Sequence, residues 1–162
     1  AYIKLCDVLF KKLSPLPKLE IRFTPDDAKP EIAHWLQKGW KSVAQGAGNL
    51  GERMNRSIEE TANSAIIIGS DCPYLELQDL NDASAALRSH DVVIGPATDG
   101  GYWLIGLKTP FPVLFQKVNW GTSTVLEETM AIAEAYNLTT KLGRELSDID
   151  TSGDWEKFCL NS

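Results

Sequence analysis

Apolar residues recur every three or four positions in six segments of the chain, which is the spacing of amphipathic helices. The first stripe begins at Tyr2. Two later segments start with residues spaced as capping boxes, Thr124 with Glu127 and Thr151 with Asp154. The pattern predicts helices over residues 2–13, 30–38, 50–61, 77–87, 124–133 and 151–159.

Short apolar runs between these segments predict strands. LEIRFT, residues 19–24, alternates apolar and polar positions, whereas AIII, residues 65–68, runs without alternation and predicts a strand buried on both faces. The stretch DVVIGPATDGGYWLIGL, residues 91–107, gives two apolar runs joined by a turn, which is a hairpin pattern. We expect weaker strands in KSVAQ at 41–45 and in NLTTKL at 137–142.

Strands that alternate with helices predict the α/β class, because each right-handed crossover returns the chain to the same sheet. We expect a three-layer arrangement with helices on both faces of a mostly parallel sheet, and the late hairpin as its antiparallel element. The 162 residues contain no linker rich in proline, glycine or serine, and their length suits one domain with a sizeable core.

The charge balance argues against one class of partner. The chain carries 22 acidic against 16 basic residues, a formal net charge of −6. It has no basic tail and no arginine-rich helix, so the electrostatic footprint of nucleic-acid binding is missing. An acidic protein with an anionic substrate needs a divalent cation or local basic groups to offset the repulsion.

Cysteine spacing and hydropathy indicate the cellular compartment in which we expect the protein. Cys6, Cys72 and Cys159 have no metal-ligand spacing, which suits a reducing compartment, and we expect all three to be small apolar fillers. The longest wholly apolar run, residues 65–68, is far below the ~18 residues of a membrane span. The N-terminus shows no signal-peptide pattern. We therefore expect a cytoplasmic protein without a membrane partner.

Asp71 follows the apolar run at residues 65–68 almost directly, which makes it a candidate metal ligand. In open α/β sheets the ligand crevice lies beyond the carboxyl ends of the strands. Asp148 and Asp150 follow a short extended segment, so they can meet Asp71 across that crevice. Mg²⁺ prefers oxygen ligands, and one or two carboxylates plus substrate phosphates complete its site. The alternative is that Ser70 or Asp71 only satisfies backbone N–H groups in a turn or at the next helix start.

Two glycine-containing stretches are the other candidates. Residues 45–49 form a loop before a helix N-terminus, where backbone N–H groups can approach a phosphate or a base edge closely. The glycines of this loop fit neither a P-loop nor the GxGxxG pattern. The turn at Asp99, Gly100 and Gly101 can equally be an ordinary hairpin turn, since glycine tolerates positive φ.

Taken together and in this order, QGAGNLGERM, IIIGSDCPYL, VVIGPATDGGYWLIGL, NWGTSTVLEET and DIDTSGDW resemble the DUF2064 family of GT-A-like proteins. That family belongs to the nucleotide-diphospho-sugar transferase superfamily and is related to phospholactate guanylyltransferases and molybdenum-cofactor guanylyltransferases. The resemblance covers about residues 45–155. It implies a Rossmann-like GT-A sheet that binds a nucleotide or sugar nucleotide together with a divalent cation, Mg²⁺ or Mn²⁺.

The resemblance also implies roles for individual residues. By motif position, Asp71 and Asp150 bind the metal with Asp148 beside them, and Asp71, Asp99 and Asp150 form the catalytic set. The residues expected to contact the nucleotide, sugar or acceptor are Gln45, Gly46, Gly48, Asn49, Leu50, Arg53, Ser70, Gly100, Gly101, Tyr102, Trp120, Gly121, Thr122 and Ser123.

One feature of the family is missing from these 162 residues. Members ordinarily begin with a strand that lies in the middle of the sheet and a loop of the type Gly-x-x-Lys-Thr-Arg-Leu, whose basic residues neutralise the donor phosphates. This sequence opens instead with AYIKLCDVLF, which looks like the helix after that loop. Either the sequence lacks a natural N-terminus, or the protein is a degenerate member.

The resemblance implies transfer of a glycosyl or nucleotidyl group from a nucleotide or nucleotide-sugar donor to an unknown small-molecule acceptor. A bound cation assists displacement at a phosphorus, or at an anomeric carbon next to a diphosphate. The alternative is a non-catalytic nucleotide-binding module that has lost its phosphate loop.

Overall fold

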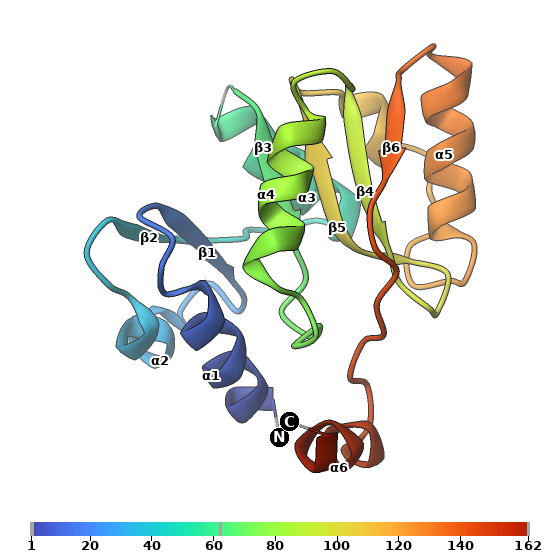
Figure 1. Cartoon of the computed structure of the whole chain (residues 1–162). Helices are drawn as coiled ribbons and strands as arrows, with labels where there is room; N and C mark the ends of the chain where they lie inside the picture. The colour runs from blue at the N-terminus through green and yellow to red at the C-terminus, as the bar shows by residue number, and fades with distance from the viewer. Residues whose placement is uncertain (1, 62, 162) are drawn as a thin grey trace.

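Helices and strands alternate along the computed structural model, which describes residues 2–61 and 63–161 (Figure 1). The elements in chain order are α1 (Tyr2–Leu13), β1 (Leu19–Phe23), α2 (Lys29–Ile32), the 3₁₀ turn η1 (Ala33–Trp35), β2 (Trp40–Ala44), α3 (Leu50–Thr61), β3 (Ala65–Ile68), α4 (Leu77–Ala86), β4 (Val92–Pro96), β5 (Tyr102–Leu107), the 3₁₀ turn η2 (Pro112–Phe115), α5 (Val125–Ala135), β6 (Thr140–Leu142) and α6 (Ser152–Asn161). Among the described helices, none is both long enough and apolar enough to cross a bilayer.

The strands form two groups. β1 and β2 make a parallel pair, and the other four strands form a sheet in the order β3-β5-β4-β6. In that sheet β5 is antiparallel to both of its neighbours and β6 is parallel to β4, so β3, β4 and β6 all run in one direction. The predicted mixed α/β fold with a mostly parallel arrangement and a late antiparallel hairpin is confirmed. No strand of the described residues pairs with the second edge of β1 or of β3.

Alternating side chains on β4 and β5 divide the core into two clusters. Val93 and Leu104 point into a cluster that also receives α1, α4, β1 and β2. Ile94 and Ile105 point to the opposite face, where α3, α5 and η2 pack. Figure 1 shows α4 in front of the four-stranded sheet with α3 on the other side. The expected three layers are therefore present, and the first cluster joins the β1-β2 pair to the larger sheet.

Four pattern-based predictions were wrong in detail. β3 is half-buried along its whole length rather than buried on both faces, because it is an edge strand that pairs only with β5. Tyr2 lies on the predicted apolar stripe yet is 62% exposed, since it occupies the first turn of α1. Cys159 is exposed, although Cys6 and Cys72 are buried fillers as expected. The helix predicted over residues 30–38 is one α-helical turn followed by a 3₁₀ turn.

The two predicted capping boxes had different outcomes. At α6 the Asp154 N–H donates to Thr151 Oγ1 at 3.1 Å and the Thr151 N–H donates to Asp154 Oδ2 at 3.1 Å, so this box is confirmed. At α5 the Thr124 hydroxyl donates to Glu128 at 2.7 Å, and its side chain makes no cap bond. The predicted pairing of Thr124 with Glu127 was therefore wrong, because Thr124 bonds to the Glu128 carboxylate instead.

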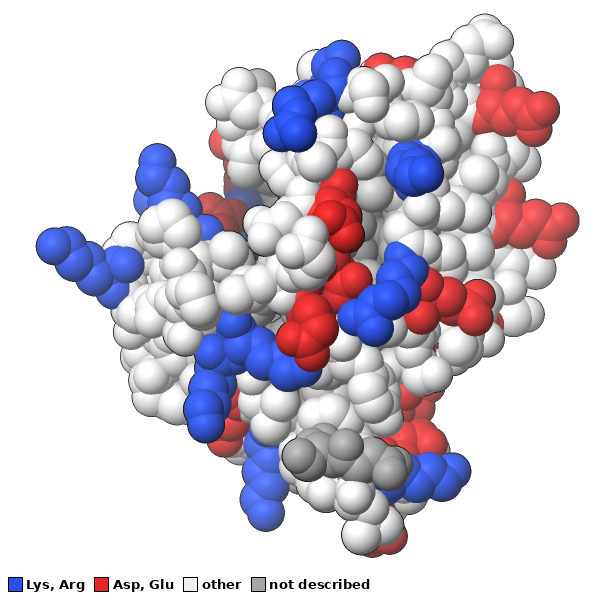
Figure 2. Space-filling view, in the orientation of Figure 1, with Lys and Arg blue, Asp and Glu red and all other residues white. Residues whose placement is uncertain are grey.

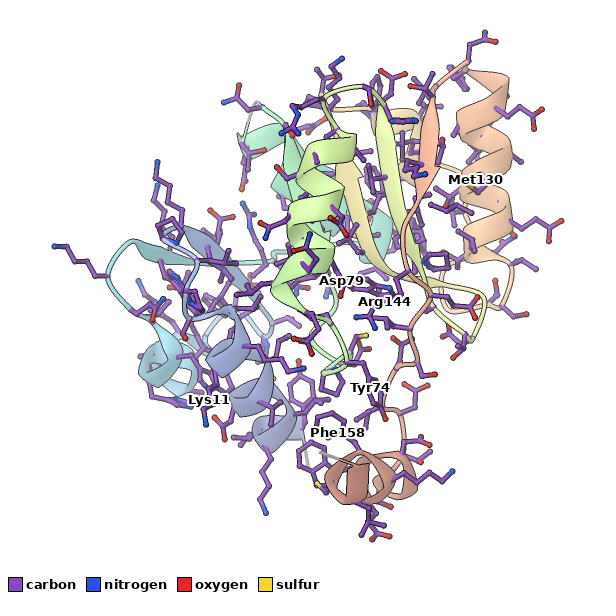
Figure 3. All side chains as sticks on the ribbon, viewed as in Figure 1. Lys11, Tyr74, Asp79, Met130, Arg144 and Phe158 are labelled. Carbon is purple, nitrogen blue, oxygen red and sulfur yellow. The ribbon has the colours of Figure 1, made fainter. Side chains whose placement is uncertain are left out.

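An ion pair holds the segment after β6 against the start of α4. Arg144 Nε and Nη2 donate to the two carboxylate oxygens of Asp79 at 3.0 and 2.7 Å, and Nη2 also donates to the Tyr74 carbonyl at 3.2 Å. Figure 3 shows Asp79 and Arg144 facing each other between α4 and this segment. In Figure 2, acidic and basic side chains lie side by side across the middle of the same face.

Burial raises the pKa of Asp79, but the hydrogen bonds from Arg144 and from the Glu76 N–H outweigh it and hold that pKa below its ordinary value. A carboxyl group with a lowered pKa stabilises the folded state above its unfolded pKa of about 3.9, and this stabilisation is lost as the pH falls through the folded value. The Arg144–Asp79 pair is therefore a stabilising contact at neutral pH and not in acid.

We expect Arg144→Gln to lower the free energy of unfolding by about 1–2 kcal/mol at pH 7, since the guanidinium is half-exposed and solvent weakens the pair. The deficit should shrink below about pH 4, where Asp79 takes up a proton in the unfolded chain first. Urea titrations at both pH values measure it. The control is Arg88→Gln, an exposed arginine for which less than about 0.5 kcal/mol is expected at either pH. An equal loss for Arg144→Gln at both pH values would contradict the ion-pair explanation.

Candidate functional site

Three strands that run in the same direction end at one edge of the sheet, and a carboxylate follows each of them. Asp71 follows β3, Asp99 follows β4, and Asp148 and Asp150 follow β6. This edge is the place where open α/β sheets carry their ligand crevice. The aspartates singled out in the sequence are therefore brought to one rim of the molecule.

Backbone hydrogen bonds hold the segment after β6 in that position. The Leu146 N–H donates to the Pro96 carbonyl at 3.0 Å, and the Thr98 N–H donates to the Leu146 carbonyl at 3.0 Å. Three residues later the Ile149 N–H donates to the Asp71 carbonyl at 2.9 Å. The residues on either side of Ile149 are therefore held next to the end of β3.

The charges of the four carboxylates act on one another, as the pKa values of Asp148 and Asp71 indicate. Burial, followed by the charges of Asp71, Asp99 and Asp150, raises the pKa of Asp148 to about 7. Burial also raises the pKa of Asp71, a hydrogen bond from its own backbone opposes this, and the charges of Asp150 and Asp99 add to the rise. Oδ1 of Asp148 is buried and has no hydrogen-bond partner among the described residues. Such a rim favours a bound cation.

The residues fit a cation that is shared with a substrate, and not one enclosed by protein ligands alone. Within residues 2–61 and 63–161, no three His, Cys, Asp or Glu side chains are placed to hold a metal ion together. Mg²⁺ needs only one or two carboxylates when phosphate oxygens and water supply its other ligands. The unpartnered oxygen of Asp148 is one free ligand of this type. The metal roles of Asp71, Asp148 and Asp150 stay predictions.

The structural alternatives for Asp71 and Asp99 have different outcomes. Asp71 does not cap α4, because Glu76 occupies the N-cap position, but its carboxylate does accept a hydrogen bond from its own backbone in the turn. Ser70 shares a hydrogen bond of 2.7 Å with the Tyr2 hydroxyl. Asp99 Oδ1 accepts from the Gly101 N–H at 2.8 Å, so Asp99 does stabilise its own hairpin turn while its charge acts on Asp71.

The loop at residues 45–49 is held closely against α3. Arg53 Nε donates to the Gly48 carbonyl at 2.8 Å, and Arg53 Nη1 donates to Gln45 Oε1 at 3.2 Å. Asn49 and Glu52 form a reciprocal cap, in which the Glu52 N–H donates to Asn49 Oδ1 at 2.9 Å. Arg53 therefore fixes the loop in this structure, and its predicted contact with a nucleotide is untested.

Arg56 on α3 is a second arginine that contacts this loop, and it was not among the residues predicted from the sequence. Its guanidinium donates to the Gln45 carbonyl and, at 2.8 Å, to the Ala47 carbonyl. It lies three residues after Arg53, on the same helix face, and this spacing was the available signal. The two arginines bring positive charge to a loop whose sequence contains none.

Asp26 is a second residue in contact with this loop that was not predicted from the sequence. It follows β1 as Asp71 follows β3, so the rule that found Asp71 also identifies it. Its Oδ1 accepts from the Gly46 N–H at 3.1 Å. The hydrogen bonds of the described residues therefore join the loop at 45–49 to Asp26, and none of them joins it to the aspartates after β3, β4 and β6.

The Asp-Gly-Gly turn packs against the segment before α5. Gly100 has a φ of +91°, and a Cβ at this position would lie 2.0 Å from the Ser123 carbonyl oxygen. The Leu126 N–H donates to the Gly100 carbonyl at 2.9 Å. Thr122 donates to the Asn119 carbonyl at 2.7 Å, which closes the loop from the other side.

Trp120 links this loop to α3. A Cβ on Gly51 would lie 2.5 Å from the Trp120 indole nitrogen, so only glycine allows this approach. The Tyr102 ring meets Trp120 edge-on, with ring centroids 6.5 Å apart, and both rings pack onto the second core cluster. Tyr102 and Trp120 thus have a packing role, and Leu50, the residue before Gly51, is 53% exposed. Their predicted substrate contacts are untested.

The structure has the fold of the nucleotide-diphospho-sugar transferases. A protein from Desulfovibrio desulfuricans G20, described as a candidate nucleotide-diphospho-sugar transferase, matches with a TM-score of 0.85 and 28% identity over 93% of this chain and 69% of its own. Two more distant structures share the fold. They are 4-diphosphocytidyl-2C-methyl-D-erythritol synthase from Anaerococcus prevotii DSM 20548 (TM-score 0.67, 10% identity, 98% of this chain and 86% of the other) and molybdopterin-guanine dinucleotide biosynthesis protein A from Archaeoglobus fulgidus (0.62, 11%, 98% and 86%).

The chain belongs to the family described as uncharacterized protein conserved in bacteria (DUF2064), whose sequence profile matches residues 12–122. This confirms the family that the motifs resemble, although NWGTSTVLEET lies only partly, and DIDTSGDW not at all, within the matched residues. No curated protein matches the chain. Asp148 and Asp150 lie beyond the matched residues, so their placement comes from the structure alone.

We expect Gly100→Ala to destabilise the protein by about 3 kcal/mol or more, because strain at positive φ adds to overlap with the Ser123 carbonyl. Gly121→Ala is the matched control. Its φ is +79° with open space around the position, so about 1–2 kcal/mol of backbone strain is expected alone. Chemical denaturation measures both. Equal losses for the two variants would contradict the close packing of the turn.

Proposed function

We propose that this protein is a transferase that uses a nucleotide or nucleotide-sugar donor with Mg²⁺ or Mn²⁺ and passes a nucleotidyl or glycosyl group to a small hydroxylated acceptor. The observation that carries the proposal is the convergence of Asp71, Asp99, Asp148 and Asp150 at the carboxyl edge of the sheet, with one buried oxygen of Asp148 left without a partner. The fold shared with nucleotide-diphospho-sugar transferases supports it.

The charge at this edge explains why a cation is part of the proposal. Four carboxylates repel an anionic polyphosphate, and burial, followed by the charges of Asp71, Asp99 and Asp150, raises the pKa of Asp148 to about 7. A divalent cation removes both problems, because its charge offsets the carboxylates and attracts phosphate oxygens. Asp71 and Asp150 are the ligands that we propose, with Asp148 beside them.

The cation, when bound, stabilises the negative charge that develops on the leaving phosphate. The chain itself binds and orients the reactants. The loop at residues 45–49, with Arg53 and Arg56 behind it, contacts the nucleotide. The Asp99 turn and residues 120–123 face the transferred group or the acceptor. Backbone hydrogen bonds hold the turn and the segment after β6, and hydrogen bonds from Arg53 and Arg56 to carbonyl groups hold the loop, which favours fixed positions for the reacting atoms.

The reaction balances without a covalent enzyme intermediate. The acceptor oxygen forms a bond to the phosphorus or anomeric carbon of the donor, and the bond from that atom to the leaving phosphate oxygen breaks. The leaving group, pyrophosphate or a nucleoside diphosphate, takes the electron pair. The acceptor proton is released to solvent.

A nucleoside diphosphate is expected to stabilise the protein only when Mg²⁺ or Mn²⁺ is present. A ligand at about 100 times its Kd adds about 2.7 kcal/mol to the stability, which corresponds to roughly 5–10 °C in Tm for a chain of this size. Thermal-shift titrations with the cation and with EDTA measure the effect. Equal stabilisation in EDTA would count against the metal-dependent site.

Asp71→Asn is expected to remove this metal-dependent shift, because the amide keeps the shape of the side chain and loses its charge. Asp82→Asn is the matched control. Asp82 is exposed on α4, accepts a hydrogen bond of 2.7 Å from Gln78, and should give the wild-type shift. Asp71 would not be a metal ligand if its variant kept the full shift.

Turnover separates a transferase from the non-catalytic alternative. The protein is incubated with Mg²⁺, a panel of nucleoside triphosphates and nucleoside-diphosphate sugars, and a mixture of small hydroxylated acceptors, and mass spectrometry follows the donors. We expect one donor to be consumed with release of pyrophosphate or a nucleoside diphosphate, and Asp71→Asn to slow this about 100-fold or more. Donor binding without consumption would support the non-catalytic module.

A further inference from the structure

The loop that carries Asp71 is attached to two distant parts of the chain. It spans residues 69–76, between β3 and α4. Figure 1 shows it between α1 on one side and the segment that leads to α6 on the other. Lys12 reaches the loop from the last turn of α1, and Arg144 reaches it from the segment after β6.

Lys12 binds three acceptors of this loop at once. Its ammonium group donates to the Pro73 carbonyl at 2.8 Å, to the Leu75 carbonyl at 3.2 Å and to Glu76 Oε1 at 2.7 Å. An ammonium group has three N–H donors, so none is left for a substrate. Lys12 therefore does not supply the positive charge that donor phosphates need.

Arg144 holds the same loop from the opposite side. Its Nη2 donates to the Tyr74 carbonyl at 3.2 Å, between the two carbonyls that Lys12 binds. The Tyr74 ring also meets the Phe158 ring edge-on, with centroids 5.2 Å apart. Three successive carbonyl groups, at residues 73, 74 and 75, thus accept hydrogen bonds from cationic side chains.

The interior of the loop gives these bonds their importance. Cys72 and Leu75 are each 0% exposed and belong to the first core cluster. A carbonyl that loses its donor beside such a core must turn toward water or stay without a partner, and both cost free energy. Removal of the Lys12 ammonium takes a donor from two carbonyls of this loop. We expect residues 73–75 to shift toward solvent as a result.

Such a shift reaches the proposed cation ligand. Asp71 lies two residues before Pro73, and its own carbonyl is fixed on the other side by the Ile149 N–H at 2.9 Å. Metal–ligand distances tolerate only about 0.2 Å, and partners that orient the ligands typically change metal affinity by about 10–100-fold. The position of the Asp71 carboxylate therefore depends on what holds the residues after it.

We propose that Lys12 is a positioning residue of the cation site, which fixes the Asp71 carboxylate by holding residues 73–75 and does not contact the donor. The inference rests on the proposed function. It adds to that function a residue of α1 that lies outside every motif of the sequence.

Mn²⁺ binding by the full chain tests this role. Mn²⁺ is titrated alone and together with ADP, GDP, CDP or UDP, and water-proton relaxation reports the protein-bound cation. Lys12→Met keeps an unbranched side chain and removes the charge with its three donors. We expect it to bind Mn²⁺ roughly fivefold or more weakly than the wild type. Equal or tighter binding would overturn the inference.

Charge and position act in opposite directions when Mn²⁺ is titrated alone. The loss of a positive charge near the carboxylates would by itself strengthen the binding of a cation. Weaker binding therefore reports a displaced Asp71. The matched control is Lys11→Met, which removes the same charge from the neighbouring exposed position of α1 and should bind Mn²⁺ like the wild type in every titration.

A purely structural role of Lys12 predicts a different result. It would lower the midpoint of urea unfolding and leave the Mn²⁺ affinity of the folded variant unchanged, which contradicts the proposal. Circular dichroism verifies that each variant is folded during the titration. If Lys12→Met does not fold, Lys12→Gln replaces it, since glutamine keeps N–H donors on a shorter neutral side chain. Wild-type affinity in a folded Lys12→Gln variant would equally refute the positioning role.

The wild type and Asp71→Asn separate this inference from the proposed function. Absence of Mn²⁺ binding by the wild type in all titrations, or unchanged binding by Asp71→Asn, would remove the proposed cation site and the inference together. Binding that depends on Asp71 and not on Lys12 would overturn the inference alone.

Discussion

The candidate site depends on three backbone hydrogen bonds that fix the segment after β6. The bonds of Leu146 with Pro96 and Thr98 extend the parallel pairing beyond the end of β6, and the bond from Ile149 to the Asp71 carbonyl then joins this segment to the end of β3. Without them Asp148 and Asp150 would belong to an irregular tail. The Arg144–Asp79 pair and the packing of Phe158 on Tyr74 reinforce the same attachment. Residues from the far end of the chain thus become part of a rim formed by earlier strands.

Local pattern predicted the elements well, because helices and strands reflect the period of apolar residues within one segment. The hairpin around the Asp99 turn and the box at Thr151 and Asp154 were correct for this reason. Burial of β3 was not predicted correctly, since it depends on which strand lies next to it. The alternation of elements, with the rule on carboxyl ends, was enough to bring Asp71 and Asp150 together. Asp26 obeys the same rule and was missed.

Other parts of the site depend on contacts that no short pattern contains. Arg56 reaches back nine residues to the carbonyl of Ala47, and Trp120 fits against Gly51 from a loop that lies far along the chain. These contacts give the loop at residues 45–49 a defined shape and bring positive charge close to it. Neither feature could be predicted from the sequence of the loop itself. The arginines contact this loop, whereas the aspartates follow β3, β4 and β6, and no hydrogen bond of the described residues joins the two groups.

The division of the strands into two groups leaves strand edges that can pair with an extended peptide. β4 and β5 have hydrogen-bonded neighbours on both sides, whereas β1 and β3, like β2 and β6, each have one strand partner within the described residues. Their outer N–H and C=O groups form a template that accepts any extended backbone, largely independent of its side chains. Amide protons along those two edges should therefore exchange with solvent sooner than those of the central strands. An extended segment that pairs with one of these edges would form backbone hydrogen bonds along the whole strand.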